Sequence, residues 1–199
     1  MSENNLRREE AAGRARILQV ESYDVDLDLT DDSGEKPGET TFRSRTTVRF
    51  GCTEPGASTH VDLTAVALIS ATLNGEALTD FDGNRLQLTS LAAANELVVE
   101  ADCCYMRTGE GLHRFVDPVD GSVYLYSQFE TFEAHRVFAC FDQPDLKAVF
   151  RLSVRAPRGW VVVSNGEAQE RPEGDDPGTW RFTETPRMST YITALVAGP

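Results

Sequence analysis

The sequence predicts an all-β protein, an antiparallel β-sandwich or strongly curved sheet preceded by one short helix. Two observations support this prediction. Apolar and polar residues alternate with a period of two over most of the chain, and turn residues separate these runs at short intervals. Alternation sends successive side chains to opposite faces of a strand. Many short strands with almost no helix are typical of antiparallel sandwiches and curved sheets.

The start of the chain favours a helix over residues 7–16. Glutamates come early in this run and arginines late, which complements the helix dipole. No repeat or low-complexity segment divides the rest, and the loop at 171–178 is too short for a linker. We therefore expect a helical arm over residues 1–16 and a single β-sandwich domain over residues 17–199.

The first predicted hairpin joins an acidic strand to a basic one. Aspartates alternate with apolar residues over 23–29, and arginines alternate with apolar residues over 42–50. Antiparallel pairing of the charged faces sets two pairs opposite each other, Asp26 with Arg45 and Asp28 with Arg43. Exposed pairs of this kind contribute about 0–1 kcal/mol each, so we interpret them as markers of register and not as a site.

Further strands are expected at short intervals along the chain. Asn74-Gly75 is a strong hairpin-turn signal, and Gly109-Glu110-Gly111 is predicted to be a turn. One more helical turn is expected near residues 132–136. The remaining predicted strands cover residues 60–63, 66–73, 85–88, 96–103, 123–129, 148–156, 160–164, 179–183 and 191–197.

Charge and cysteine content limit the possible partners. The net charge of -13 argues against nucleic acid and anionic membranes as partners. No apolar stretch approaches the roughly 20 residues that span a bilayer, and the polar start of the sequence has no secretory signal. The four cysteines do not form a disulfide framework, so reduced thiols in a cytoplasmic protein are expected. A monomer is the simplest expectation.

Gln128 and Glu130 are the candidate site. They lie two residues apart in 124–130 (Tyr-Leu-Tyr-Ser-Gln-Phe-Glu), which has the pattern of a strand, so both should project from one face. An amide beside a carboxylate forms an acceptor-rich site suited to a cationic group such as the α-amino end of a peptide. Such pairs also occur on solvated sheet faces, and the tripeptide alone leaves both interpretations open.

Catalytic and metal-binding patterns are otherwise missing from the sequence. The three histidines, His60, His113 and His135, lie far apart and no His-Glu-x-x-His occurs. No serine stands in a Gly-x-Ser-x-Gly context, and nothing marks two carboxylates as facing each other across a cleft. We expect neither a catalytic residue nor a metal ligand in this chain.

Several motifs in order carry a family resemblance. Residues 108–115 read Thr-Gly-Glu-Gly-Leu-His-Arg-Phe, and the 124–130 run follows them. Residues 138–150 read Phe-Ala-Cys-Phe-Asp-Gln-Pro-Asp-Leu-Lys-Ala-Val-Phe. Together with 23–29, 160–166 and 185–191, they resemble the N-terminal domain of M1-family zinc aminopeptidases, most closely the actinobacterial aminopeptidase N type. The resemblance extends from about residue 10 to residue 199.

The resemblance implies a saddle-shaped β-domain that covers one side of a thermolysin-like catalytic domain in the same polypeptide. It implies that Glu130 holds the free α-ammonium of a peptide substrate and that Gln128 lines the pocket for the first side chain. Arg136 and Asp142 match the family pattern, and we interpret both as structural residues that fix the turn after the substrate strand.

The family's zinc motif, His-Glu-x-x-His with a distant Glu, and its Gly-Ala-Met-Glu-Asn motif do not occur in residues 1–199. We therefore expect one domain of a longer hydrolase that removes N-terminal amino acids from peptides. Zinc would bind to residues outside this chain, which alone would hold no cofactor and be inactive. The alternative is a free-standing β-sandwich module that binds a peptide or a glycan.

Overall fold

Strands are the main regular structure of the described chain, which covers residues 5–31, 33–173 and 177–199 of the computed structural model. One α-helix, α1 (Arg8–Ile17), comes first, and two short 3₁₀ helices, η1 (Ala134–Arg136) and η2 (Thr190–Ile192), lie between strands. The strands are β1 (Leu18–Asp28), β2 (Thr41–Cys52), β3 (Thr59–Asp62), β4 (Ala67–Leu73), β5 (Glu76–Ala77), β6 (Arg85–Leu88), β7 (Ala94–Cys104), β8 (Gly111–Val116), β9 (Val123–Gln128), β10 (Val149–Ala156), β11 (Val161–Ser164), β12 (Ala168–Glu170), β13 (Gly178–Phe182) and β14 (Leu195–Gly198).

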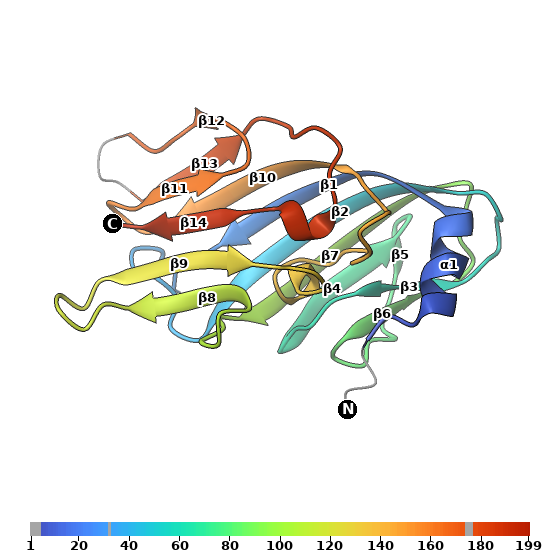
Figure 1. Cartoon of the computed structure of the whole chain (residues 1–199), viewed down its shortest axis with the longest axis horizontal. Helices are drawn as coiled ribbons and strands as arrows, with labels where there is room; N and C mark the ends of the chain where they lie inside the picture. Colours follow the sequence, from blue (N-terminus) through green and yellow to red (C-terminus); the bar gives the residue numbers. More distant parts are fainter. Residues whose placement is uncertain (1–4, 32, 174–176) are drawn as a thin grey trace.

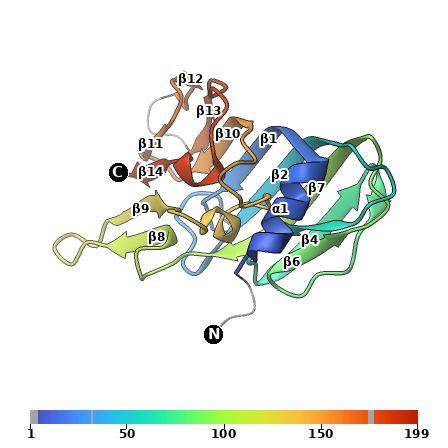
Figure 2. The ribbon, with the colours of Figure 1, turned by 45° about the vertical axis from the view of Figure 1, so that its right-hand side comes forward.

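These strands form three sheets. The large sheet has eight strands in the order β12-β13-β10-β1-β2-β7-β4-β5, the small sheet has the order β11-β14-β9-β8, and β3 pairs with β6. The small sheet lies over one half of the large sheet, while α1 lies at the opposite end of the molecule from the β8–β9 hairpin tip (Figure 1). The β8–β9 hairpin projects from the body in both views (Figure 2). The predicted all-β fold with one short helix is confirmed.

One strand pair departs from the antiparallel prediction. β1 and β10 pair in parallel, with Tyr23 beside Phe150. Parallel neighbours need a long crossover connection, and every strand from β2 to β9 lies between these two along the chain. Local alternation reveals a strand but not the direction of a partner so distant in sequence.

The predicted β1–β2 register is confirmed, because Asp26 lies opposite Arg45 and Asp28 opposite Arg43. The ion pairs of Arg43 and Arg45, however, join β2 to β7 and not to β1. Arg43 pairs with Glu100 at 2.9 Å and with Asp102 on β7, and Arg45 pairs with Glu100 at 3.4 Å. A central strand has two neighbours, and β7 supplies acids on the other side of β2. The outer face of the large sheet is therefore a network of ion pairs.

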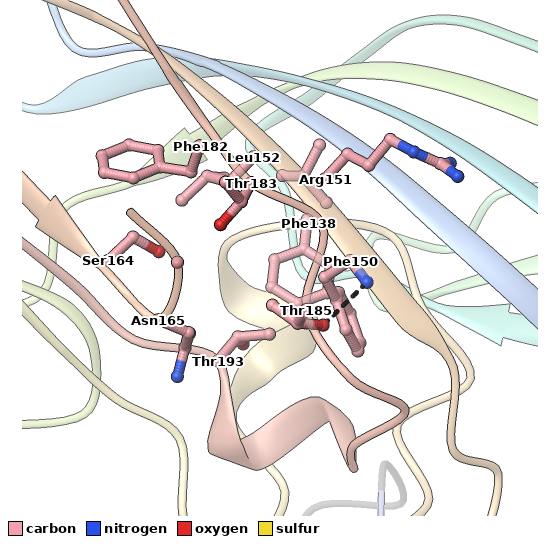
Figure 3. A pocket seen from close by; sticks show the side chains of 12 residues that line it. Phe138, Phe150, Arg151, Leu152, Ser164, Asn165, Phe182, Thr183, Thr185 and Thr193 are labelled. Carbon is pink, nitrogen blue, oxygen red and sulfur yellow. Dashed lines mark hydrogen bonds between the residues drawn. The ribbon is translucent and has the colours of Figure 1, made fainter. Parts of the chain in front are cut away.

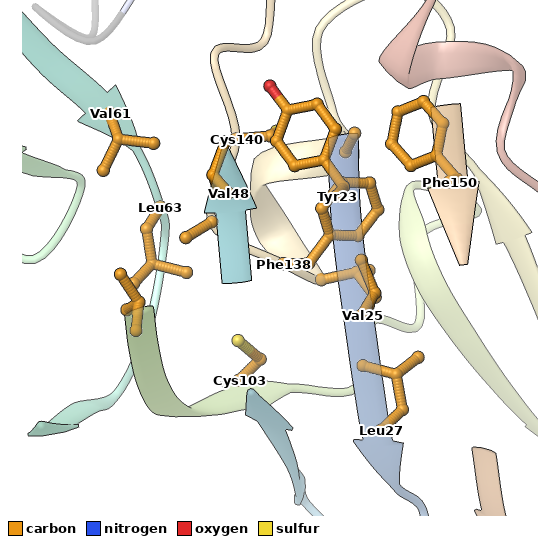
Figure 4. Packing of buried hydrophobic residues seen from close by; sticks show 14 of the residues in the cluster. Tyr23, Val25, Leu27, Val48, Val61, Leu63, Cys103, Phe138, Cys140 and Phe150 are labelled. Carbon is orange, nitrogen blue, oxygen red and sulfur yellow. The ribbon is translucent and has the colours of Figure 1, made fainter. Parts of the chain in front are cut away.

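Aromatic rings fill the space between the large and small sheets. Tyr23 is fully buried and stacks on Phe150 with 4.8 Å between ring centroids. Phe138 meets both rings edge-on, at 6.2 Å and 6.1 Å. Figure 4 shows these three rings gathered beside β1. The apolar residues that alternate with aspartates in β1 thus supply one wall of the core.

Helix α1 is tied to the body by a buried ion pair. The predicted helix is confirmed within one residue at each end. Arg14 is 3% exposed and donates from Nη1 to Asp62 Oδ2 at 2.8 Å, while its Nε donates to Gln143 Oε1 at 3.3 Å.

Within the described ranges, no helix has the length and apolar character needed to cross a membrane.

The Asp62 carboxylate should make stability depend on pH. Burial raises its pKa, but neighbouring His60 and Arg14 outweigh burial, so the pKa lies below the ordinary value. A pKa that is lower in the folded state gives a stabilisation that is complete above about pH 4 and lost as the pH falls through the folded-state value. The difference in unfolding free energy between the native chain and Asp62→Asn, measured in urea, should therefore shrink below about pH 4. A difference that stays constant below about pH 4 would contradict the lowered pKa of Asp62.

The remaining differences from the predicted elements are local. β5, β8 and β12 were not predicted, and the strand predicted over 191–197 begins only at Leu195 because η2 occupies its first part. Asn74 and Gly75 form the predicted turn with φ values of 54° and 88°. Part of the predicted 171–178 loop lies outside the described residues.

Candidate functional site

Gln128 and Glu130 lie where β9 ends. Gln128 is the last residue of the strand, and Glu130 stands in the following turn, so the strand predicted over 123–129 is one residue too long. The alternation of exposed and buried side chains nevertheless continues past the end of β9. Gln128 and Glu130 are exposed, while Phe129 between them is 3% exposed. Among the described residues, no hydrogen bond or ion pair engages either the Gln128 amide or the Glu130 carboxylate.

Phe129 anchors this strand end in the core. Its ring meets the Phe138 ring edge-on at 6.1 Å, and its carbonyl accepts the Glu133 backbone N–H at 3.2 Å. The second contact closes the turn that carries Glu130. Burial of the Phe129 ring thus holds Gln128 and Glu130 at the surface, because the residues on either side of an inward-pointing side chain point outward.

The turn after Glu130 leads into η1, which a buried carboxylate holds. Asp142 Oδ2 accepts the His135 backbone N–H at 3.1 Å and lies 2.8 Å from His135 Nδ1. Asp142 Oδ1 accepts the Thr190 hydroxyl at 2.6 Å. The interpretation of Asp142 as a structural residue agrees with these contacts. Sequence reasoning did not assign a role to His135, since its partner is identified only by the folded chain.

Charged side chains border the site on the β8 side. Gly111 pairs with Gln128, and a Cβ at Gly111 would lie 3.2 Å from Arg136 Cβ and Cδ, so Arg136 packs directly over this glycine. Arg136 pairs with Glu133 and, at 3.8 Å, with Glu110. Glu110 and Glu133 thus share one guanidinium, and Glu130 adds a third carboxylate two residues after Gln128. This excess of negative charge favours a cationic ligand.

Sequence reasoning missed the contribution of β8 to the site. The two glycines of Gly109-Glu110-Gly111 predicted a turn only, and in the structure both glycines do have positive φ values, 87° and 58°. β8 begins at Gly111, and its register with β9 brings Glu110 and Arg136 beside Gln128. The signal that the sequence offered for this contribution was Gly111, the glycine against which Arg136 packs.

The outer face of the small sheet is apolar. Across it, Val163 of β11, Val196 of β14 and Tyr126 of β9 occupy one row, with exposed fractions of 56%, 53% and 41%. His113 of β8 ends the row and stacks on Tyr126 at 4.8 Å. Gln128 shares the face of Tyr126, two residues along β9. Contiguous exposed apolar surface of this kind marks an interaction site, in contrast to the ion-paired large sheet.

A small cavity lies elsewhere, between β10 and the 164–166 turn (Figure 3). Its volume is about 30 Å³, room for one or two water molecules. Phe138 and Phe150 line it, and Thr185 accepts the Phe150 backbone N–H at 3.0 Å. Arg151 directs its guanidinium away from it, toward Asp24 at 3.1 Å. This cavity is too small for a peptide side chain of ordinary size.

No three His, Cys, Asp or Glu side chains in the described part of the chain cluster closely enough to hold a metal ion. His60 faces Asp62, His113 stacks on Tyr126, and His135 contacts Asp142, so each histidine has a different environment. These residues do not fit a zinc site.

The Peptidase M1 N-terminal domain family matches residues 19–192. The chain belongs to this family. This M1 N-terminal domain is 52% identical to Aminopeptidase N of Streptomyces lividans, over the whole chain and 23% of that protein. It is 29% identical to a leucyl aminopeptidase of Saccharolobus solfataricus, over 92% of the chain and 22% of that protein. The chain thus spans less than a quarter of the length of these relatives.

The fold matches that of solved structures as well. An M1 zinc metallopeptidase from Deinococcus radiodurans superposes with a TM-score of 0.73 at 22% identity, covering 92% of this M1 N-terminal domain and 43% of that chain. A second structure of that enzyme, bound to a Tyr-Ser-Ala substrate, has a TM-score of 0.72 at 21% identity. At this level of identity the likeness establishes the architecture.

Proposed function

We propose that this chain is the substrate-capping domain of a zinc metallo-aminopeptidase that removes N-terminal amino acids from peptides. Glu130 binds the free α-ammonium of the substrate, and Gln128 contacts the first side chain. The main support is that both polar side chains are exposed at the end of β9 without a partner among the described residues, beside an excess of carboxylates.

Charge explains the selectivity that this arrangement would give. A carboxylate and an ammonium form a charge-assisted hydrogen bond, which is about twice as strong as a neutral one. A peptide with a blocked N-terminus would leave the Glu130 carboxylate desolvated and unpaired, which is unfavourable. Recognition of the free amino group thus restricts the enzyme to chain ends.

The apolar face of the small sheet favours a domain that is covered by another part of the same protein. Val163, Val196 and Tyr126 would be buried against a catalytic domain, and Gln128 and Glu130 would then lie at the edge of that interface. The matched relatives have more than three quarters of their length outside the matched region. The apolar row favours a capping domain over a free-standing peptide- or glycan-binding module, because a capping domain must expose apolar surface where its neighbouring domain packs.

Zinc would be bound by residues outside this chain, because the described residues do not fit a metal site. When bound, zinc activates the water that attacks the peptide bond. The residues of this chain bind and orient the amino end of the substrate, and the chain alone is inactive. All four cysteines are free, which agrees with a cytoplasmic protein.

Substitutions in the full-length enzyme test the roles of the pair. Glu130→Ala should lower kcat/KM for substrates with a free amino group by about 10- to 100-fold, the value of one hydrogen bond between charged groups. Gln128→Ala should lower it less, because a neutral amide contributes less, and should mainly change the preference for the first side chain. Steady-state kinetics on a series of aminoacyl amides measure both effects.

Glu35→Ala is the control and should leave kcat/KM unchanged, because Glu35 is exposed on the 33–36 turn before β2. Equal and small losses for Glu130→Ala and Gln128→Ala would refute the role assigned to Glu130.

A further inference from the structure

Asp142 lies at the junction of the two segments that hold Glu130. One segment is the turn that leads from Glu130 into η1, and the other is the stretch from η2 into β14, the strand that pairs with β9. Asp142 is fully buried and uses both carboxylate oxygens, one for each segment. A buried carboxylate is tolerated only when its partners are in place, so this residue specifies the relative position of the two segments.

The contacts on the η1 side lead directly back to Glu130. His135 meets Asp142 Oδ2 with both its backbone N–H, at 3.1 Å, and its ring Nδ1, at 2.8 Å. The Phe132 ring lies against the His135 ring at 4.5 Å. The Glu133 N–H then donates to the Phe129 carbonyl at 3.2 Å, which closes the turn around Glu130.

The contacts on the η2 side reach Glu130 through β9. Thr190 is fully buried and donates its hydroxyl to Asp142 Oδ1 at 2.6 Å. β14 follows η2, and its Leu195 N–H donates to Ser127 Oγ at 2.8 Å, next to Gln128. The strand before Glu130 and the turn after it are therefore both aligned by one carboxylate.

The position of Asp142 is itself fixed. Its backbone N–H donates to Asp62 Oδ2 at 3.2 Å, and Asp62 is held by Arg14 at 2.8 Å. All three of these side chains are at most 3% exposed, so water cannot replace a lost contact. A network of this kind has one arrangement, and a shift at Asp142 is transmitted to the segments that it joins.

We infer that Asp142 is a positioning residue for Glu130: its buried carboxylate sets where the Glu130 carboxylate meets the substrate ammonium. This inference rests on the function proposed above. Asp142 itself touches no substrate. Displacing a recognition group by about 1 Å is enough to weaken the reaction strongly, so a residue in this place affects specificity from within the core.

Two ligands that differ only in the α-amino group test the inference. L-leucine hydroxamate and its des-amino analogue carry the same zinc-binding group, so the ratio of their dissociation constants isolates the ammonium contact. Calorimetry on the full-length enzyme gives this ratio for each variant. Asn keeps the shape of Asp but offers one acceptor oxygen, so Asp142→Asn should reduce the preference for the amine by about tenfold.

Thr190→Val is a milder variant, which removes a single hydrogen bond and should reduce the preference for the amine by about threefold. It keeps the inference testable if Asp142→Asn fails to fold. Leu97→Ala is the control for loss of stability alone, since Leu97 is fully buried in β7 on the large sheet. It should lower the melting temperature and leave the ratio at the native value.

A double variant separates positioning from an independent effect. In the Glu130→Ala background, Asp142→Asn should change the ratio no further. The inference is overturned if Asp142→Asn and Thr190→Val leave the ratio at the native value, or if their losses add in full to that of Glu130→Ala. If Glu130→Ala alone leaves the ratio unchanged, the recognition role of Glu130 is wrong, and the inference falls with it.

Discussion

Replacing Arg14 by methionine should lower the free energy of unfolding by about 3–5 kcal/mol. Methionine preserves most of the packing of the side chain but leaves the Asp62 carboxylate buried without its cation. Asp62 is 2% exposed, so water cannot take over the role of Arg14. Arg14 also donates to the His60 carbonyl and to Gln143, each at 3.3 Å, and these acceptors would lose a partner as well. Urea unfolding of the chain, followed by tryptophan fluorescence, measures the loss.

Arg16 on the same helix supplies the matched control. It pairs with Glu54 at 3.4 Å, but the two side chains are 72% and 55% exposed, so Arg16→Met should change stability by less than about 1 kcal/mol. Replacing both members of the buried pair, as Arg14→Met with Asp62→Leu, should recover part of the lost stability because no charge remains buried. Equal losses for Arg14→Met and Arg16→Met would show that burial of the pair has no energetic consequence.

Phe138→Ala should cost about 3–5 kcal/mol, the usual range for a phenylalanine lost from a core. Phe138 is 3% exposed and its ring lies within 6.2 Å of the Tyr23, Phe129 and Phe150 rings. It also lines the small cavity, so truncation would enlarge an existing space, which the surrounding structure fills only in part. Thermal and urea unfolding of the purified chain give the value.

Phe138→Leu retains most of the apolar volume and should cost about 1–2 kcal/mol. Phe115→Ala is the comparison at an exposed position, since Phe115 is 44% exposed on β8. It should change the free energy of unfolding by no more than about 0.5 kcal/mol. A loss for Phe138→Ala no larger than that for Phe115→Ala would mean that the aromatic cluster does not determine stability.

Much of the strand pattern was predictable because alternation is a local property. β1 and β2 were placed with their register, and the Asp26–Arg45 opposition followed from matching charged faces. The actual ion pairs of Arg45 were not predictable in the same way, since its partner Glu100 comes from β7, the second neighbour of β2. Which of two flanking strands supplies a partner depends on the order of the sheet, and alternation within one strand carries no information about that order.

For the candidate site, the sequence by itself determined the chemistry of the pair. Gln128 and Glu130 flank an apolar Phe129, and that spacing alone places the two polar side chains outward and the ring inward. The surrounding motifs also identified the family. These properties are carried by neighbouring residues and by composition, so they can be inferred before any tertiary contact is known.

Only the tertiary structure decided what holds that pair in place. β9 ends before Glu130, and the turn beyond it is held by Asp142, which also binds Thr190 from the last part of the chain. Glu110 and Arg136 reach the site through the β8–β9 register. These contacts join residues far apart in sequence, and their geometry depends on how the sheets stack and exclude water. Local pattern predicts which side chains face outward, whereas the packed core determines which distant groups fix their position.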